Sequence, residues 1–254
     1  MKIWNNVLIT GASSGIGLAF AGNIAGNCNN LIIVSRNQFK LNKIKEDLEN
    51  EHKIRAWVID CDLTALDSVK EIINFIESND IIPDLFINNA GIGVYGKFNE
   101  TVQDRIQEII NLNILSSTLL IKEIAQLMNR KNGGTILNVS STIAFRKSLG
   151  WSVYAASKAY ILSLSKSLAI EYKKSNLKIS VLCPGKTDTD FDFNSGYKSN
   201  SAKTKMTPEY VAKYTMKKLV KGKEVIIPGF TNKLKYYLFK FLPEFITDMI
   251  VKSI

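Results

Sequence analysis

The 254-residue sequence is poor in side chains that bind metals or form disulfides. Its single histidine, His52, lies in the polar run ENEHKIRA, where we expect a surface position. One histidine argues against a Ser-His-Asp triad and against metal sites built from several histidines. The three cysteines, Cys28, Cys61 and Cys183, are far apart and form no C-x-x-C motif. We therefore predict no metal site and no disulfide framework, and a reducing cytoplasmic location fits this composition.

Long hydrophobic runs are also missing. No apolar run reaches the roughly 18 residues that span a bilayer. The N-terminal segment MKIWNNVLITG leads directly into a glycine loop, so it is typical of a first strand rather than of a signal peptide. With 46% hydrophobic and 22% charged residues, the composition is that of an ordinary soluble globular protein. The length suits one large α/β domain or two small ones.

Negative charge is scarce, above all near the C-terminus. The net charge is +10, and residues 200–254 contain eleven lysines but only four acidic residues. A basic surface attracts nucleic acid, anionic lipid or acidic carrier proteins, and it also promotes solubility. Charge alone does not choose among these partners.

Short apolar runs alternate with longer amphipathic segments. The short runs read almost continuously apolar, as strands buried on both faces do. The predicted strands span residues 3–10, 31–35, 54–60, 85–88, 135–140, 179–183 and 224–227. The predicted helices span residues 15–28, 39–51, 66–78, 102–130, 151–174 and 208–220. This alternation predicts an α/β fold with one doubly wound, mostly parallel sheet of about seven strands and ligands at the carboxyl ends of the strands. Residues 192–205 are predicted to form a long loop, which often serves as a mobile lid.

A glycine loop follows the first predicted strand. In LITGASSGIG, Gly11, Gly15 and Gly17 are spaced G-x-x-x-G-x-G and open the first helix. Glycines here permit a tight turn and let a pyrophosphate approach backbone N–H groups at a helix N-terminus. The position in an alternating α/β chain predicts a dinucleotide phosphate site.

The end of the second predicted strand bears on the choice of dinucleotide. An acidic residue at this point would bind the ribose 2′-hydroxyl of NAD. This chain has Ser35 and Arg36 instead. Because a guanidinium pairs well with a 2′-phosphate, the sequence favours NADP(H) over NAD(H).

Tyrosine and lysine occur four residues apart at three places, namely Tyr154/Lys158, Tyr214/Lys218 and Tyr236/Lys240. Residues at this spacing are neighbours on a helix, so a lysine ammonium favours the ionised tyrosine. At about 5 Å and an effective dielectric constant of about 20, the Coulomb energy is about 3 kcal/mol, or about two pKa units. One such pair is expected by chance, and a solvated helix face explains the second and third pairs.

Five short motifs single out the first pair. TGASSGIG, NNAG, NVSS, YAASK and CPGKTDT occur in this order along the chain. Together they resemble the short-chain dehydrogenase/reductase family over essentially the whole sequence. The resemblance implies a single-domain Rossmann fold, a nicotinamide cofactor, a homo-oligomer (dimer or tetramer) and a catalytic Asn-Ser-Tyr-Lys tetrad.

Carried over to this chain, the catalytic tyrosine is Tyr154 and the lysine is Lys158. The spacing to the tyrosine favours Ser141 over Ser140 as the serine. The resemblance implies that Tyr154 is the general acid or base, that Ser141 hydrogen-bonds the reacting oxygen, and that Lys158 lowers the tyrosine pKa and holds the nicotinamide ribose.

The tetrad asparagine has two candidates in IINLNILSS, Asn111 and Asn113. The family's distance to the serine favours Asn113. It is expected to position a water that links Lys158 to solvent.

The resemblance also implies the cofactor contacts. Asp62 matches the aspartate that binds the adenine amino group, although a helix N-terminal turn also explains it, and Thr187 rivals Thr189 near the carboxamide or phosphates. The full set of expected cofactor-binding residues is Gly11, Ser13, Ser14, Gly15, Ile16, Gly17, Ser35, Arg36, Asp62, Leu63, Asn89, Ala90, Gly91, Tyr154, Lys158, Pro184, Gly185, Thr187 and Thr189.

The C-terminal segment carries an apolar stripe beside basic residues. Leu234, Leu238, Phe241, Phe245 and Met249 recur at helical spacing, with lysines between them and a proline that breaks the run. We expect residues 1–230 to form the dinucleotide-binding catalytic domain and residues 231–254 an amphipathic extension. The extension packs on the domain or at a subunit interface, or it caps the substrate site or meets a membrane surface.

The sequence therefore predicts an NADP(H)-dependent oxidoreductase that interconverts an apolar ketone or aldehyde and its alcohol. A reductase of 3-oxoacyl thioesters on an acyl-carrier protein is one alternative, and a non-catalytic NADP(H)-sensing protein is another. We expect no nucleic-acid partner, and a cytoplasmic location with peripheral membrane contact as an alternative.

Overall fold

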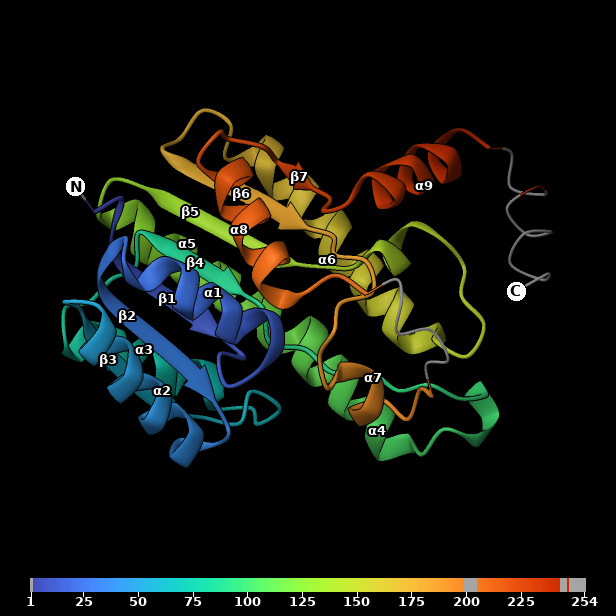
Figure 1. Cartoon of the computed structure of the whole chain (residues 1–254), viewed down its shortest axis with the longest axis horizontal. Helices are drawn as coiled ribbons and strands as arrows, with labels where there is room; N and C mark the ends of the chain where they lie inside the picture. Colours follow the sequence, from blue (N-terminus) through green and yellow to red (C-terminus); the bar gives the residue numbers. More distant parts are fainter. Residues whose placement is uncertain (1, 199–204, 243–245, 247–254) are drawn as a thin grey trace.

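The apolar runs pair into one parallel sheet in the computed structural model, which describes residues 2–198, 205–242 and 246 (Figure 1). Across these residues the sheet has seven strands in the order β3-β2-β1-β4-β5-β6-β7. The strands are β1 (Trp4–Thr10), β2 (Cys28–Ser35), β3 (Arg55–Asp60), β4 (Leu85–Asn88), β5 (Gly134–Val139), β6 (Leu177–Leu182) and β7 (Val225–Ile226). The predicted doubly wound α/β fold is confirmed, since every neighbouring pair is parallel.

Helices connect the strands and cover both faces of the sheet. The α-helices are α1 (Gly15–Ala25), α2 (Gln38–Glu51), α3 (Ser68–Ser78), α4 (Gln103–Ile110), α5 (Ser117–Arg130), α6 (Ser152–Glu171), α7 (Phe191–Asn194), α8 (Pro208–Leu219) and α9 (Phe230–Phe241). Two 3₁₀ turns, η1 (Phe98–Glu100) and η3 (Thr142–Phe145), and one π-helical turn, η2 (Asn111–Ser116), complete them. Local chemistry sets several boundaries: at α8, for example, Pro208 occupies the first turn and the Thr207 hydroxyl accepts a hydrogen bond from Tyr210 N.

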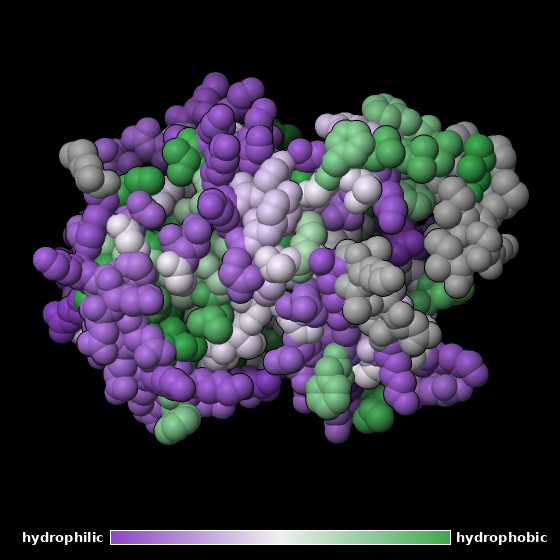
Figure 2. Space-filling model, in the orientation of Figure 1, coloured by the Kyte–Doolittle hydropathy of each residue, from purple (hydrophilic) through white to green (hydrophobic). Residues whose placement is uncertain are grey.

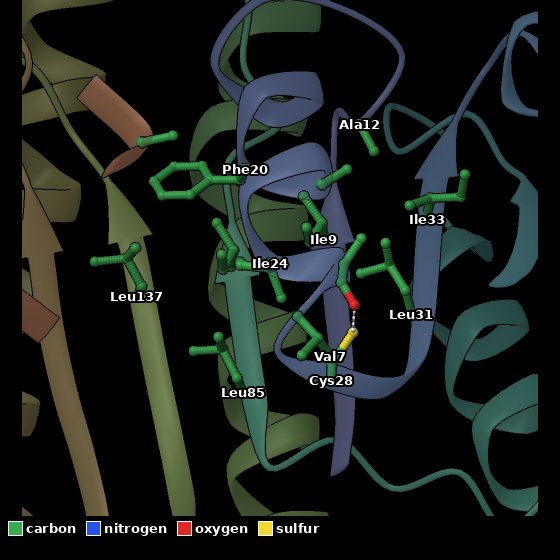
Figure 3. Close-up of a cluster of buried hydrophobic side chains, with 14 of the residues drawn as sticks. Val7, Ile9, Ala12, Phe20, Ile24, Cys28, Leu31, Ile33, Leu85 and Leu137 are labelled. Carbon is green, nitrogen blue, oxygen red and sulfur yellow. Dashed lines mark hydrogen bonds between the residues drawn. The ribbon is translucent and has the colours of Figure 1, made fainter. Parts of the chain in front are cut away.

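Alternate residues of the strands face opposite helical layers. Val7 and Ile9 of β1 pack with α1, α2 and α8, whereas Leu8 packs with α3, α5 and α6. Figure 3 shows the first layer, where Phe20 and Ile24 of α1 lie over the strands. Because both faces are buried, the central strands read as unbroken apolar runs, which is why the sequence revealed them.

Two predicted helices differ from the structure. Cys28, predicted to end the first helix, begins β2 because it pairs with Trp4 of β1, and its thiol contacts Ala25 O. The predicted helix over residues 102–130 is interrupted by the π-helical turn η2. The first difference arises from strand pairing with a distant segment, which local periodicity does not report.

The predicted loop over residues 192–205 contains part of a short helix, α7, which begins one residue earlier. Lys205 at the far end pairs with Asp192 of α7 at 3.1 Å, so the described ends of the loop lie together. Residues 199–204 of this loop, and Phe245 and Met249 of the predicted C-terminal stripe, lie outside the described residues. In the part of the chain that the structure describes, none of the helices is both long enough and apolar enough to cross a bilayer.

We predict that Gly17→Ala destabilises the protein. A Cβ at Gly17 would overlap Gly11 O and approach Asn89 Nδ2 to 2.6 Å, so the loop must shift, at a cost of about 1–3 kcal/mol. Gly22→Ala in the same helix is the matched control, because a Cβ there meets no atom within 4 Å. The control should gain up to about 1 kcal/mol. Urea unfolding of both variants tests this, and equal effects would contradict it.

Candidate active site

A cavity of about 920 Å³ lies at the carboxyl ends of the strands. It brings together most of the residues that the sequence singles out. Those that line it are Gly11, Ser13, Ser14, Gly15, Ile16, Ser35, Arg36, Asp62, Leu63, Asn89, Ala90, Gly91, Ser141, Tyr154, Lys158, Pro184, Gly185, Thr187 and Thr189. Gly17 and Asn113 do not line the cavity, but each lies against a residue that does: Gly17 against Gly11, and Asn113 against Gly91.

The glycine loop is tied to the loop after β4. Gly11 and Gly15 have φ of +66° and +54°, a conformation that favours glycine. The Asn89 amide donates to Thr10 O (2.9 Å) and Gly11 O (3.2 Å). The Thr10 hydroxyl accepts hydrogen bonds from the backbone N–H groups of Asn89 and Ala90 in return. These bonds hold the two loops against each other at the cavity wall.

The N-terminus of α1 fits an anionic phosphate. Its N-cap residue, Ser14, makes no side-chain capping bond, and the first turn contains no acidic residue. The helix dipole and the backbone N–H groups therefore favour a negative group at this end. Together with the glycine loop and the neighbouring cavity, the residues present fit a dinucleotide.

One end of the cavity combines Ser35 and Arg36 with Asp62. Arg36 Nη1 lies 3.8 Å from Asp62 Oδ2, and both side chains are well exposed. Asp62 Oδ1 also accepts hydrogen bonds from the backbone N–H and the hydroxyl of Thr64, both at 2.9 Å. Asp62 therefore forms a local turn with Thr64 and not the helix N-terminal turn that the sequence offered, because α3 begins at Ser68 with Asp67 as its N-cap. Its second carboxylate oxygen faces Arg36.

Tyr154 is buried at the start of α6. Its pKa is raised above the ordinary value, mainly because burial disfavours the phenolate, and a hydrogen bond with Ser141 opposes this shift. Ser141 Oγ also accepts a bond from Ile143 N at 3.2 Å. Ser140 points elsewhere, since its hydroxyl donates to Lys158 O at 2.7 Å. Of the two serines, only Ser141 faces the tyrosine.

Lys158 is buried one helical turn after Tyr154. Its ammonium donates to Val139 O at 3.0 Å and lies 5.8 Å from the centre of the Tyr154 ring. Burial lowers the pKa of Lys158 to about 8. The pKa of Tyr154 is raised overall because desolvation of the phenol dominates, and the Lys158 ammonium is directed to a carbonyl; that Lys158 lowers the tyrosine pKa stays a prediction.

Asn113 lies in the π-helical turn η2 and is buried. Its amide exchanges two hydrogen bonds with the backbone of Ile92 and donates a third to Ser157 Oγ at 3.0 Å. A Cβ built on Gly91 would lie 3.2 Å from Asn113 Oδ1 and 3.0 Å from Lys158 Nζ. Asn113 thus fixes the loop after β4 beside Lys158, as π-helical turns at functional sites often do.

The other two tyrosine–lysine pairs do not line the cavity. Tyr214 of α8 packs against the core layer beside α1, and Lys218 lies 5.5 Å from its ring. Tyr236 of α9 contacts Phe145, with ring centres 4.5 Å apart. The spacing gives similar pair geometry at 154 and 214, so the surroundings rather than the spacing distinguish them.

The loop after β6 supplies both threonine candidates. A Cβ built on Gly15 would lie 3.0 Å from Thr189 Cγ2, so Thr189 contacts the glycine loop. The Thr187 hydroxyl donates to Gly185 O at 3.0 Å, within its own loop. On these contacts Thr189 is the better placed of the two toward a group at the helix N-terminus.

The sequence did not reveal an aromatic wall that stands beside Tyr154. We define this wall as Tyr95, Trp151, Phe191 and Tyr197. Trp151 and Phe191 are stacked with ring centres 6.1 Å apart, and each packs against Tyr154. Tyr95 and Tyr197 contact Trp151 and each other. Trp151 stands three residues before Tyr154, a helical spacing that could have revealed it, whereas the others come from remote loops.

Comparison with known proteins identifies the family. The short chain dehydrogenase family model matches residues 5–199. The chain belongs to the short-chain dehydrogenase/reductase family. It is 28% identical over 238 residues to a 7beta-hydroxysteroid dehydrogenase of Mediterraneibacter gnavus, covering 92% of this chain and 89% of the relative. It is 30% identical over 219 residues to the 17-beta-hydroxysteroid dehydrogenase type 3 of Rattus norvegicus, covering 85% and 70%.

A solved structure agrees with the fold. The short-chain dehydrogenase from Sphingobium yanoikuyae in complex with NADPH superposes with a TM-score of 0.84, at 26% identity over 94% of this chain and 96% of that one. As a member of the short-chain dehydrogenase/reductase family, the chain is an oxidoreductase that acts on CH–OH groups with a nicotinamide dinucleotide.

We predict that buried Lys158 makes stability depend on pH. Between its folded pKa of about 8 and the ordinary 10.5, the unfolded chain binds the proton that the folded chain has lost. Stability of the wild type should therefore rise relative to Lys158→Met as the pH increases through this window. Melting temperatures of both proteins from pH 7 to 10.5 measure this, with Lys213→Met as the control for loss of a lysine. A constant difference from wild type would refute it.

Proposed function

We propose that the protein is an NADP(H)-dependent carbonyl reductase for bulky apolar ketones, with Tyr154 as the general acid. The observation that carries the proposal is the buried Tyr154, which contacts Ser141 on one side and the aromatic wall on the other. The proposal is more specific than family membership in three respects: the proton donor, the dinucleotide and the substrate class.

The proton chemistry follows from the surroundings of Tyr154. When bound, the nicotinamide supplies the hydride for reduction. Tyr154 donates its proton to the carbonyl oxygen, and the Ser141 hydroxyl, oriented by Ile143 N, hydrogen-bonds the same oxygen as negative charge develops. The raised pKa keeps the phenol protonated at neutral pH, which is the form that a general acid requires.

Two buried polar groups support this arrangement. The Lys158 ammonium, on the same helix, would hold the ribose hydroxyls of the nicotinamide half. Asn113 holds the adjoining loop through Ile92. Both side chains make hydrogen bonds inside the protein, so their positions are preorganised before substrate binds.

The preference for NADP(H) rests on Arg36. Its guanidinium lines the cavity near Ser35, where an acidic side chain would repel a 2′-phosphate. The Asp62 contact is long and exposed, so it costs little to exchange it for a phosphate. A guanidinium also offers bidentate geometry to phosphate oxygens.

The substrate class rests on the aromatic wall. Trp151 and Phe191 present flat apolar surface directly beside the Tyr154 ring. Aromatic surface beside the proposed proton donor suits a large apolar ring system better than a small sugar or acid. The names of the hydroxysteroid dehydrogenases to which the chain is similar support the same class.

We predict that Tyr154→Phe binds NADPH normally but reduces a bulky aromatic ketone about 10²–10⁴-fold more slowly, since only the proton donor is lost. Tyr214→Phe is the matched control, because it removes a hydroxyl from another tyrosine with a lysine four residues later. NADPH fluorescence titration and single-turnover oxidation of NADPH measure the two effects. Near-wild-type turnover of Tyr154→Phe, or no NADPH oxidation by the wild type with any bulky ketone tested, would reject the proposal.

We predict that Arg36→Gln weakens NADPH binding about 10- to 150-fold and leaves NADH binding unchanged. Loss of charge-assisted hydrogen bonds to the 2′-phosphate accounts for about 1.5–3 kcal/mol. Arg55→Gln is the control, because Arg55 stacks on Trp57 in β3, away from the cavity. Equal effects of Arg36→Gln on the two dinucleotides would refute the assignment.

A further inference from the structure

Helix α9 presents an apolar face to solvent. Its inner side packs on the protein through Tyr236, which contacts Phe145 of η3, while the Asn232 amide donates to Pro228 O at 2.9 Å. No residue of α9 is fully buried. We define its outer face as the five exposed side chains Phe230 (80% exposed), Leu234 (60%), Tyr237 (54%), Leu238 (46%) and Phe241 (75%).

The outer face is a continuous stripe bordered by lysines. At 100° per residue the five side chains fall within an arc of about 100°. Exposed Lys235 and Lys240 lie along opposite edges of this arc, whereas the Lys233 ammonium packs on α8, 5.3 Å from the centre of the Tyr214 ring. The helix contains no acidic residue. Figure 2 shows hydrophobic side chains gathered over α9, at the upper right of the molecule.

We propose that the outer face of α9 binds an anionic lipid surface. A helix that lies in the plane of a bilayer interface buries an apolar stripe among the acyl chains, with lysines at its edges among the headgroups. The described α9 has this arrangement on its solvent side. Each lysine near an anionic surface adds about tenfold or less to the affinity.

Charge selects lipid over a second copy of the same helix. In a two-fold contact the same surface meets itself, so the lysine edges of one copy would face those of the other. Because α9 has no acidic side chain to pair with them, such a contact would be repulsive. Anionic headgroups complement both edges at once.

The position of α9 would place the cavity near the lipid. Tyr236 packs on η3, whose Thr142 and Ile143 line the cavity. An apolar ketone dissolved in the membrane would then enter beside the surface that holds it. This last step depends on the proposed function, whereas lipid binding does not.

Sedimentation of the full chain with vesicles tests lipid binding without any activity measurement. The wild type should sediment with vesicles of phosphatidylcholine and phosphatidylglycerol, and less with phosphatidylcholine alone. The double variant Leu234→Gln with Leu238→Gln should weaken binding at least about tenfold, because two apolar side chains are no longer transferred from water into the bilayer. Phe39→Gln with Ile170→Gln is the matched control, because both side chains are exposed on other helices.

A second pair of variants tests the charge. Lys235→Glu with Lys240→Glu should abolish the preference for anionic vesicles, whereas Lys213→Glu with Lys217→Glu on α8 should retain most of it at the same net charge. Melting temperature and light-scattering mass of every variant establish that fold and assembly are unchanged. The proposal is overturned if the wild type does not bind anionic vesicles. It is also overturned if each variant pair changes vesicle binding no more than its control pair does, or if the leucine variants instead change the mass of the assembly.

Discussion

Parallel strand pairing is the constraint on which the site depends. β1 pairs with β4, β4 with β5 and β5 with β6 in register, so the loops that follow them emerge at one edge. Short contacts then join these loops, as between Asn89 and Gly11 or between Thr142 N and Pro184 O at 2.9 Å. Side chains from distant parts of the chain meet in one cavity because the sheet aligns the ends of its strands.

Burial of Tyr154 and Lys158 controls the electrostatics of the pair. In an exposed helix a lysine four residues after a tyrosine stabilises the phenolate, but burial acts on both groups and favours their neutral forms. The outcome is a protonated phenol that contacts a serine hydroxyl, next to a lysine whose pKa is about 8. The phenol is therefore present in its protonated form, the form that proton donation to a carbonyl oxygen requires.

Apolar side chains stand both beside the proposed proton donor and on the outside of the molecule. The aromatic wall adjoins Tyr154, and η3 links the cavity lining to α9. The same choice of side chains, large and apolar, thus recurs from the proposed substrate site to the proposed lipid-binding face. A substrate with little affinity for water would find favourable contacts at both places.

Patterns close together in the sequence determined much of this protein. Alternation of apolar and amphipathic segments predicted the sheet, because strands buried on both faces need unbroken apolar runs. The glycine spacing and the YAASK motif pointed to residues that the fold does gather in one cavity. Only the tertiary structure decided that Cys28 joins β2, that a π-helical turn carries Asn113, that the Ser140 hydroxyl donates to Lys158 O, and that an aromatic wall stands beside Tyr154. These features, like the direction of the tyrosine pKa shift, depend on contacts between segments far apart in the chain and on the water that those contacts exclude, and local periodicity carries no record of either.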